Sequence, residues 1–306
     1  MRSKLIVYLV SGVARLSLSS VQRIGGLLGR LLYLVPNRER HNARVNIELC
    51  FPAMSRDERE RLLRRALIES ARTILEMPGI WRRDVRSALS VVHPGEGWDL
   101  PGQALAKGRG VIIAAPHLGA WELAGHRLAQ MAPVTLLYRP PREAAIEPLL
   151  LEGRSRGGAR LVPTSAAGVR ALFEALKRGE MVGILPDQQP RQAGTSAGVF
   201  APFFGVPALT MVLVNRLARR TGAETLFTYV ERLPIGQGYR MHFLSAPPGI
   251  ADADSEKAAA ALNLGVEHCV RRCPQQYQWS YRRFSVRPAG ARSPYRRGAS
   301  SPQAQG

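Results

Sequence analysis

The chain of 306 residues is long enough to bury a sizeable core, and its hydrophobic fraction of 45% excludes wholesale disorder. It carries 43 Lys and Arg against 23 Asp and Glu, which leaves a formal net charge of +20 and a pI near 11.1. Such an excess indicates an anionic partner, which can be a nucleic acid, an anionic membrane surface or an acidic protein.

The first segment, residues 1–37, combines a basic start with an apolar run, as a signal peptide does. The uncharged run over residues 5–14 is shorter than the ~18 apolar residues of an easy membrane span, and no small-residue cleavage site follows it cleanly. On a helical wheel, polar residues fall within one arc of roughly 100°; they are Lys4, Ser11, Arg15, Gln22, Arg23 and Arg30. The pattern favours a helix that lies in a membrane interface with its arginines toward phosphates. A strongly tilted span and an amphipathic helix packed on the protein's own core are the alternatives.

The second segment, residues 38–89, is predicted to be helical and to pack on the core. Ser55 and Glu58 have the spacing of a capping box, in which each side chain bonds the other residue's backbone N–H at a helix start. Apolar residues then recur at helical spacing; they are Leu62, Leu63, Ala66, Leu67 and Ile74.

From residue 90 to residue 287 the pattern alternates between strands and helices. The predicted strands are 109–116, 134–139, 159–163, 181–186, 225–233 and 239–246, and the predicted helices are 119–131, 145–154, 166–179, 209–222 and 255–273. The strands show little polar alternation, which is typical of a sheet covered on both faces. We therefore predict an α/β domain with a mostly parallel central sheet and helices on both faces. The Arg-, Gly-, Ser- and Pro-rich residues 288–306 are predicted to form a disordered basic tail.

The first of these strands runs directly into His117, and Glu122 follows five residues later. Ligands of open α/β sheets bind at the carboxyl ends of strands, so His117 stands where a reacting group is expected. Glu122 would fall in the first turn of the next helix, near enough to hydrogen-bond one imidazole nitrogen. A histidine held by a carboxylate can act as a general base, with its tautomer fixed and its imidazolium stabilised. Without a catalytic role, His117 would be a capping or core residue and Glu122 would complement the helix dipole.

Two other chemistries are less well supported. Residues 194–198 fit the G-x-S-x-G of serine hydrolases with Ser196 as nucleophile, but that motif needs a strand before it and a helix after it. Proline-containing extended segments flank it here, so a flexible Gly/Ser loop is the better interpretation. Cys50, Cys269 and Cys273 are too few for a disulfide framework and lack a second ligand pair with zinc spacing, so we expect free thiols and no metal. The chain has no Gly-rich phosphate-binding motif and no nucleic-acid motif.

Several segments, in chain order, resemble the bacterial lipid A biosynthesis (late) acyltransferases, a branch of the glycerolipid acyltransferase superfamily. The segment HLGAWE at 117–122 is similar to the superfamily's H-x4-D/E motif. The other matching segments are RHNARVNIELCFP (40–52), LYRPP (137–141), LKRGEMVGILPDQ (176–188), VFAPFFGVPALT (199–210) and PQQYQWSYRRFSVRP (274–288). Together they extend over nearly the whole chain.

The resemblance implies transfer of a fatty acyl group from acyl carrier protein to a hydroxyl of a lipid A precursor, without a cofactor, at the cytoplasmic face of the bacterial inner membrane. His117 would deprotonate the acceptor hydroxyl, and Glu122 would orient and charge-stabilise His117. Arg139 would suit a phosphate of the lipid or the phosphopantetheine arm. Asp187 and Gln188, which follow another predicted strand, would complete the polar rim of the site. The alternative for Asp187 is an ordinary turn residue.

One position departs from the family's pattern. Members often carry a histidine just before the terminal Arg-Arg-Phe, where this chain has Tyr281. The net charge suits a phosphorylated lipid and an acidic carrier protein, and we expect no nucleic acid as partner. Two alternatives stay open: an acyltransferase for another lipid acceptor (a phosphatidylinositol mannoside, an ornithine lipid or a lysophospholipid) and a basic polyanion-binding protein without catalysis.

Overall fold

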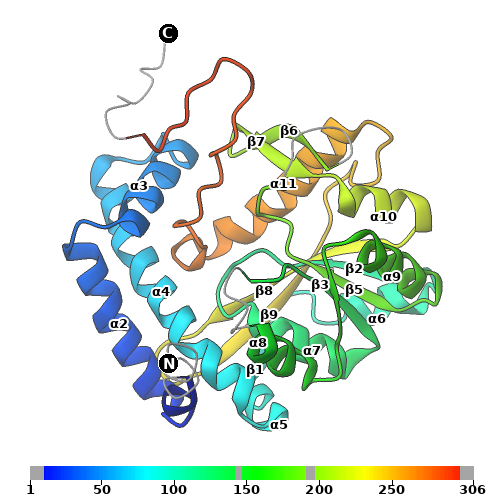
Figure 1. Ribbon diagram of the computed structural model, residues 1–306, viewed down its shortest axis with the longest axis horizontal. Coiled ribbons are helices and arrows are strands. Elements are labelled where there is room, and N and C mark those ends of the chain that lie inside the picture. The colour runs from blue at the N-terminus through cyan, green and yellow to red at the C-terminus, as the bar shows by residue number, and fades with distance from the viewer. Residues whose placement is uncertain (1–9, 142–146, 191–196, 297–306) are drawn as a thin grey trace.

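A seven-stranded sheet runs through the centre of the protein in the computed structural model, which describes residues 10–141, 147–190 and 197–296 (Figure 1). The strand order is β1-β9-β8-β2-β5-β3-β4, and every neighbouring pair is parallel except β8 with β9. The strands are β1 (Val92–Pro94), β2 (Val111–Ala114), β3 (Val134–Tyr138), β4 (Arg160–Pro163), β5 (Met181–Ile184), β8 (Glu224–Arg232) and β9 (Tyr239–Ser245). The prediction of a mostly parallel sheet is confirmed.

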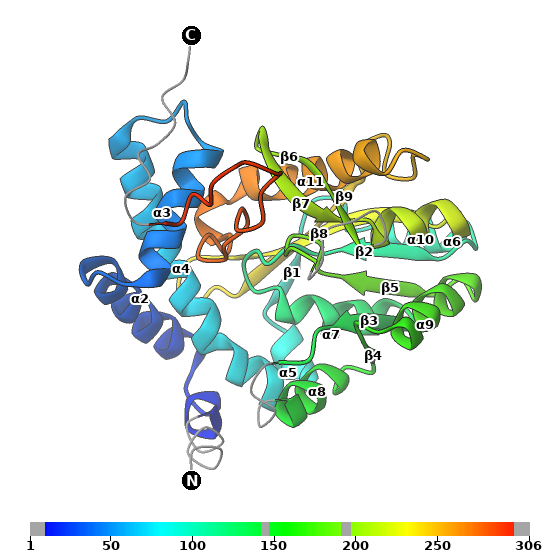
Figure 2. The ribbon, with the colours of Figure 1, turned by 45° about the horizontal axis from the view of Figure 1, so that its top comes forward.

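The central strands are buried on both faces, because successive side chains enter two different hydrophobic cores. In β2, Ile112 and Ala114 face one core and Val111 and Ile113 face the other, and all four are fully buried. Helices α9 (Ala166–Lys177), α10 (Leu213–Thr221) and α11 (Ser255–Arg272) close the first core, and α5 (Val85–Leu89), α6 (Leu100–Ala106) and α7 (Glu122–Met131) close the second. Figure 2 shows α11 and α7 on opposite sides of the sheet.

A separate antiparallel hairpin consists of β6 (Gly198–Phe203) and β7 (Val206–Met211). The prediction of a helix from residue 209 is therefore wrong at its start, because residues 209–211 pair with β6 and α10 begins only at Leu213. A short apolar run has no period that separates strand from helix, so the available strand partner decides its conformation. Helix α8 (Glu147–Ser155) completes the predicted helices of this part of the chain.

Helices α2 (Leu18–Leu34), α3 (Arg38–Cys50) and α4 (Arg56–Arg82) lie along one side of the sheet, at the left of Figure 1. The predicted capping box at the start of α4 is confirmed. The backbone N–H of Ser55 donates to Glu58 Oε2 at 2.7 Å, and that of Glu58 donates to Ser55 Oγ at 3.2 Å. Both α3 and α4 contribute to the first core.

Helix α2 approaches α4 very closely through glycines. A Cβ added at Gly25 would lie 2.8 Å from Arg72 Cα, and one added at Gly29 would lie 2.3 Å from Ile68 Cα, so larger residues would push the helices apart. The large apolar side chains of α2 instead face away from the protein; those exposed are Ile24, Leu27, Leu28, Leu31 and Leu34. Gln22, predicted for the polar outer stripe, is fully buried. Among the described residues, no helix is both long enough and apolar enough to traverse a bilayer.

The segment predicted to be a disordered tail is ordered over its first part, residues 288–296. Tyr295 is buried, its hydroxyl donates to Asn46 Oδ1 of α3 at 2.5 Å, and it accepts from the backbone N–H of Phe284 at 3.0 Å. The tail therefore packs against α3 as far as residue 296, and the rest of the predicted tail lies outside the described residues.

Candidate active site

Two adjacent strands end side by side and carry the central pair of the site. In the parallel pair β2–β5, Ala114 is the register partner of Ile184, and His117 and Asp187 each follow three residues later. His117 Nδ1 lies 2.8 Å from Asp187 Oδ1, and the backbone N–H of His117 donates to Asp187 Oδ2 at 3.0 Å. Asp187, predicted for the rim, is thus the hydrogen-bond partner of the predicted base.

The second imidazole nitrogen of His117 faces the side-chain amide of Gln188. The Gln188 amide nitrogen lies 3.3 Å from His117 Nε2 and donates to Gln278 Oε1 at 3.4 Å. Because an ionised carboxylate only accepts, Asp187 favours the tautomer of neutral His117 with the proton on Nδ1 and the lone pair on Nε2. The ring of Trp121 packs edge-on against the imidazole at 5.1 Å between centroids. The His117 side chain is 15% exposed, so Nε2 can receive a proton from a bound molecule.

The carboxylate of Asp187 is ionised although it is only 3% exposed. Burial raises its pKa, but the attraction that His117 exerts in its protonated form and the two hydrogen bonds from His117 outweigh burial, and the net pKa lies below the ordinary value. An ionised carboxylate at Nδ1 holds the imidazole in one tautomer and stabilises its protonated form.

Glu122 lies in the first turn of α7, as predicted, but the expected hydrogen bond to His117 is not formed. Its carboxylate accepts from Trp81 Nε1 at 2.9 Å, from Arg154 Nε at 2.9 Å and from Arg154 Nη2 at 2.5 Å. Burial raises the pKa of Glu122, and Arg154, Trp81 and His117 together lower it below its usual range. The reason for the difference is that the α7 start turns Glu122 toward α4 and α8, where Arg154 requires a counter-ion.

The remaining predicted residues, Arg139 and Gln188, lie at the same edge of the sheet. Arg139 follows β3, is exposed, and donates from Nη2 to the backbone oxygen of Gln189 at 3.4 Å. The hydroxyl of Tyr281 accepts from the backbone N–H of Gln189 at 2.9 Å. Tyr281 therefore supports the loop that follows Asp187.

Four residues of the site are absent from the sequence-based prediction: Trp81, Trp121, Arg154 and Gln278. Trp121 lies inside the HLGAWE segment, so the motif itself could have indicated it. The other three come from the end of α4, from α8 and from the segment after α11, and Gln278 also donates its backbone N–H to His117 O at 3.0 Å. No local pattern marks them, because only tertiary packing brings them to the site.

An apolar pocket lies beside Trp121, between α7 and strands β2, β3 and β5. Water-sized molecules can occupy only about 50 Å³ of it, which is well below the ~300–1,000 Å³ of small-molecule sites. The ion pair of Glu122 and Arg154 belongs to its wall. The large aliphatic residues and the tryptophan that line it are Ile113, Trp121, Leu128, Leu136, Leu137, Leu161, Ile184 and Leu185.

The other candidate chemistries gain no support. Ser196 lies outside the described residues, and the strand β6 begins at Gly198, where a serine nucleophile motif requires a helix. Cys50, Cys269 and Cys273 are buried and free, and burial raises the pKa of the Cys269 thiol to about 12. Over the described part of the chain, no three potential metal ligands gather.

Comparison with known proteins identifies the family. A family model described as bacterial lipid A biosynthesis acyltransferase matches residues 3–285. The chain belongs to this acyltransferase family. It is 32% identical to the lipid A biosynthesis palmitoleoyltransferase of Escherichia coli (strain K12) over 276 residues, 89% of this chain and 87% of that protein. It is 30% identical to the lauroyltransferase of the same organism over 292 residues, with coverage of 92% and 91%, and 25% identical to its myristoyltransferase over 280 residues, with coverage of 90% and 83%.

The resemblance predicted from the sequence is therefore confirmed, and the chain is an acyltransferase of lipid A biosynthesis. Membership of this family implies a lipid A precursor as the acceptor. The three relatives are named for different acyl groups, palmitoleoyl, lauroyl and myristoyl, so a shared family is compatible with several chain lengths.

Proposed function

We propose that this lipid A acyltransferase uses His117 as general base, with Asp187 as the carboxylate that orients it and Glu122 as a second negative charge. The observation that carries the proposal is the imidazole bonded to Asp187 through Nδ1, with Nε2 facing the side-chain amide of Gln188. A base of this kind accelerates attack by a hydroxyl by roughly 10²–10⁴-fold.

In the proposed reaction, His117 Nε2 takes the proton of the acceptor hydroxyl while that oxygen attacks the carbonyl carbon of an acyl thioester. A new ester C–O bond forms, the C–S bond breaks, and the leaving thiolate receives the proton from the imidazolium, so atoms and charges balance without an acyl-enzyme. The acceptor hydroxyl replaces the Gln188 amide as the donor to Nε2. Asp187 stabilises the imidazolium directly, and Glu122 does so at longer range, since protonated His117 and Glu122 interact electrostatically.

The proposed donor is an acyl carrier protein, and the proposed acceptor is the 3-hydroxyl of a hydroxyacyl chain already attached to the lipid A precursor. The net charge of +20 supports both, because a phosphorylated lipid and an acidic carrier are attracted to a basic protein. Arg139, exposed at the edge of the site, would bind a phosphate of the lipid or of the phosphopantetheine arm.

The pocket beside Trp121 is the proposed contact site for part of the fatty acyl chain, since its accessible space of about 50 Å³ is smaller than a whole chain. Its lining is mainly leucine and other apolar side chains, and Trp121 contacts both the pocket and the ring of His117. A chain held there would bring its thioester carbonyl next to the base. The aromatic residues Phe203 and Phe204 belong to the first core and do not line this pocket.

Helix α2 is proposed to lie on the cytoplasmic face of the inner membrane. Its outward leucines form an exposed apolar surface of a kind that soluble monomers rarely present, and its arginines would contact lipid phosphates. Replacing Leu27 and Leu31 by serine should lower the fraction of protein that floats with anionic vesicles. Unchanged flotation would contradict membrane contact through α2.

The deciding experiment supplies purified enzyme with lipid A precursor and either acyl carrier protein or coenzyme A thioesters, and identifies the product by mass spectrometry. We expect acyloxyacyl product from the carrier-protein donor and none with His117→Ala. Equal use of the coenzyme A thioester would contradict the proposed donor. Product only on a lysophospholipid or ornithine lipid would contradict the proposed acceptor, and near-normal turnover by His117→Ala would contradict the mechanism.

A further inference from the structure

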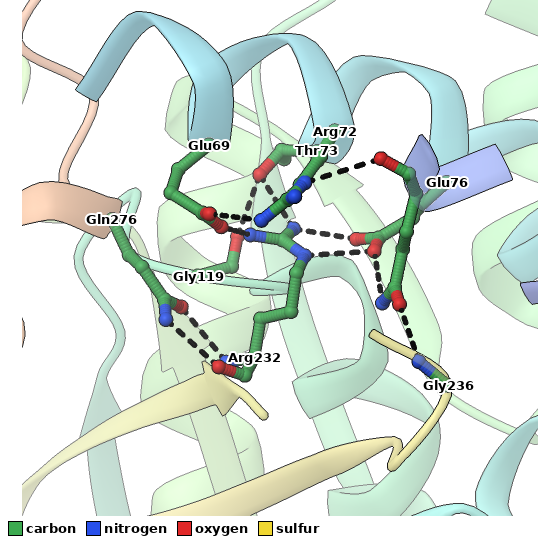
Figure 3. Close-up of polar contacts among 9 residues, drawn as sticks. Glu69, Arg72, Thr73, Glu76, Gly119, Arg232, Gly236 and Gln276 are labelled. Atoms are coloured by element: carbon green, nitrogen blue, oxygen red, sulfur yellow. Dashed lines mark hydrogen bonds and ion pairs between the residues drawn. The ribbon is translucent and has the colours of Figure 1, made fainter. Parts of the chain in front are cut away.

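A buried polar cluster that includes neither His117 nor Asp187 lies between α2, α4 and β8 (Figure 3). Its centre is Arg232, the last residue of β8. The guanidinium donates to Glu76 Oε1 at 2.7 Å and Oε2 at 2.5 Å, to Glu69 Oε2 at 2.7 Å and to Thr73 Oγ1 at 2.8 Å. Glu69, Thr73 and Glu76 follow each other at helical spacing on one face of α4, so a polar stripe of the helix faces Arg232.

The cluster is costly for the fold to bury. The side chains of Arg232 and Glu76 are 1% and 2% exposed. Burial opposes the charge of Arg232, but Glu76 and Glu69 outweigh it and raise its pKa, so the guanidinium stays charged. A buried ion pair of this kind is often no more stable than well-packed apolar residues would be. Its presence is therefore better explained by a role in fixing one conformation of the chain around it.

The first connection from the cluster to the active site runs through Thr73. Thr73 Oγ1 accepts a hydrogen bond from Arg232, so the hydroxyl can donate its own proton to another group. It donates this proton to the backbone oxygen of Gly119 at 3.2 Å. Gly119 is two residues from His117 and has φ +64°, and a Cβ there would lie 1.9 Å from Val230 O. The loop that carries His117 thus turns at the residue that Thr73 holds.

The second connection runs through Gln276. Its side chain exchanges two hydrogen bonds with the backbone of Arg232, at 2.8 and 2.9 Å, and its backbone oxygen accepts from the N–H of Gly119 at 3.0 Å. Both polar groups of the Gly119 backbone are therefore held by residues that contact Arg232. Two residues on, Gln278 donates to His117 O.

The cluster also reaches α2 through Gln22. The amide nitrogen of Gln22 donates to Glu76 Oε1 at 2.9 Å, and its oxygen accepts from the backbone N–H of Gly236 at 2.9 Å. Arg72 adds a third contact, since its Nε donates to the backbone oxygen of Gln22 at 3.1 Å. Contacts therefore run without a break from α2 through Glu76, Arg232 and Thr73 to Gly119 (Figure 3).

We propose that Thr73 and Arg232 are positioning residues for His117, and that Gln22 makes α2 part of this support. Helix α2 then contributes to turnover as well as to any contact with lipid. The inference depends on the proposed role of His117 as base. A displacement of the base by a fraction of an ångström lowers the rate while leaving substrate binding largely intact.

The test compares Thr73→Val with Thr225→Val in detergent micelles, where membrane attachment does not limit activity. Thr73→Val keeps the shape of the side chain and removes the bond to Gly119, while Arg232 keeps both oxygens of Glu76. Thr225 is a matched control, because it is buried on β8 and its hydroxyl has no partner among the described residues. We expect kcat to fall roughly 10- to 100-fold in Thr73→Val with KM within twofold, to recover in Thr73→Ser, and to be unchanged in Thr225→Val.

The variant Gln22→Met tests the part played by α2, with an expected fall in kcat of at least about threefold in micelles. A kcat of Thr73→Val within twofold of wild type, an equal loss in Thr225→Val, or no recovery in Thr73→Ser would overturn the positioning role. A normal kcat in Gln22→Met would remove α2 from the proposal. His117→Ala, measured in the same assay, separates the two hypotheses: if it is inactive while Thr73→Val is normal, the positioning inference alone fails.

Discussion

The two carboxylates of the site, Asp187 and Glu122, are each paired with a basic side chain, yet the two pairs leave different groups available. Asp187 bonds one nitrogen of His117, and the other nitrogen faces the side-chain amide of Gln188. Glu122 is closed off by two donors of Arg154 and by Trp81. Because a guanidinium does not release its proton in a protein, only the first pair can exchange a proton with substrate.

The His117–Asp187 pair can therefore take part in proton transfer, whereas the Glu122–Arg154 pair holds helices together. The Glu122–Arg154 pair joins α7 to α8, with Trp81 joining both to α4, and it forms part of the wall of the apolar pocket. The two acids should therefore respond differently to substitution. Asp187 should affect turnover far more than stability, and Glu122 should affect both.

Removal of the base itself should give the largest effect. His117→Ala is expected to lower kcat/KM by about 10³–10⁴-fold, because it removes the group that accepts the hydroxyl proton. The thermal midpoint should change little, since the side chain is partly exposed. Steady-state assays with the lipid A precursor check the rate, and circular dichroism during heating checks the fold. A variant within tenfold of wild type would contradict the assignment.

Breaking the ion pair of Glu122 and Arg154 should lower the stability of the protein the most. Glu122→Gln is expected to lower the free energy of unfolding by about 3 kcal/mol, because it leaves the charge of Arg154 buried without a counter-ion. The double variant Glu122→Gln, Arg154→Gln should recover part of that loss, since it removes both charges. Urea denaturation measures both values. A double variant less stable than the single one by the full additive amount would show that the pair is not coupled.

Replacing the orienting acid should have a smaller effect than removing the base. Asp187→Asn is expected to lower kcat by about 10²-fold, because the amide no longer stabilises the imidazolium and can favour the wrong tautomer. The loss in unfolding free energy should stay below about 1.5 kcal/mol, the scale of one neutral hydrogen bond. Equal kcat in Asp187→Asn and wild type would leave Glu122 as the better candidate for the partner of His117.

The ion pair of Glu122 and Arg154 should also make the stability of the protein depend on pH. The pKa of Glu122 is lowered in the folded protein, so its ionised form stabilises the fold at any pH above the unfolded carboxyl pKa of about 4.3. That contribution is lost as the pH falls through the lowered pKa. The difference in stability between wild type and Glu122→Gln should therefore be constant from pH 8 to about pH 5 and shrink below about pH 4. A difference that grows on acidification would contradict the pairing.

The smallest effect is expected at the rim. Arg139→Ala should raise the KM for one substrate by about threefold to tenfold with little change in kcat, because an exposed cation contributes about 1 kcal/mol to binding an anion. The difference between variant and wild type should narrow at high salt, where such contacts are screened. A fall in kcat with KM unchanged would place Arg139 in the chemical step instead.

The sequence by itself determined the elements and most of the residues at the active edge. Apolar runs without alternation specify strands buried on both faces, and His117 could be located because it follows such a strand, whereas Asp187 was indicated by the family resemblance. The capping box fixed the start of α4 through local hydrogen bonds alone. These features depend on near neighbours in the chain, which a pattern can record.

Only the tertiary structure decided which side chains meet. The strand order places β5 beside β2. In this register His117 forms its hydrogen bond with Asp187, which is 70 residues away in the chain, and not with Glu122, which is five residues away. The same packing turns Gln22 inward, exposes the leucines of α2, and converts the predicted start of α10 into a strand. Each outcome depends on a partner distant in sequence, because burial, ion pairing and strand pairing are satisfied in space.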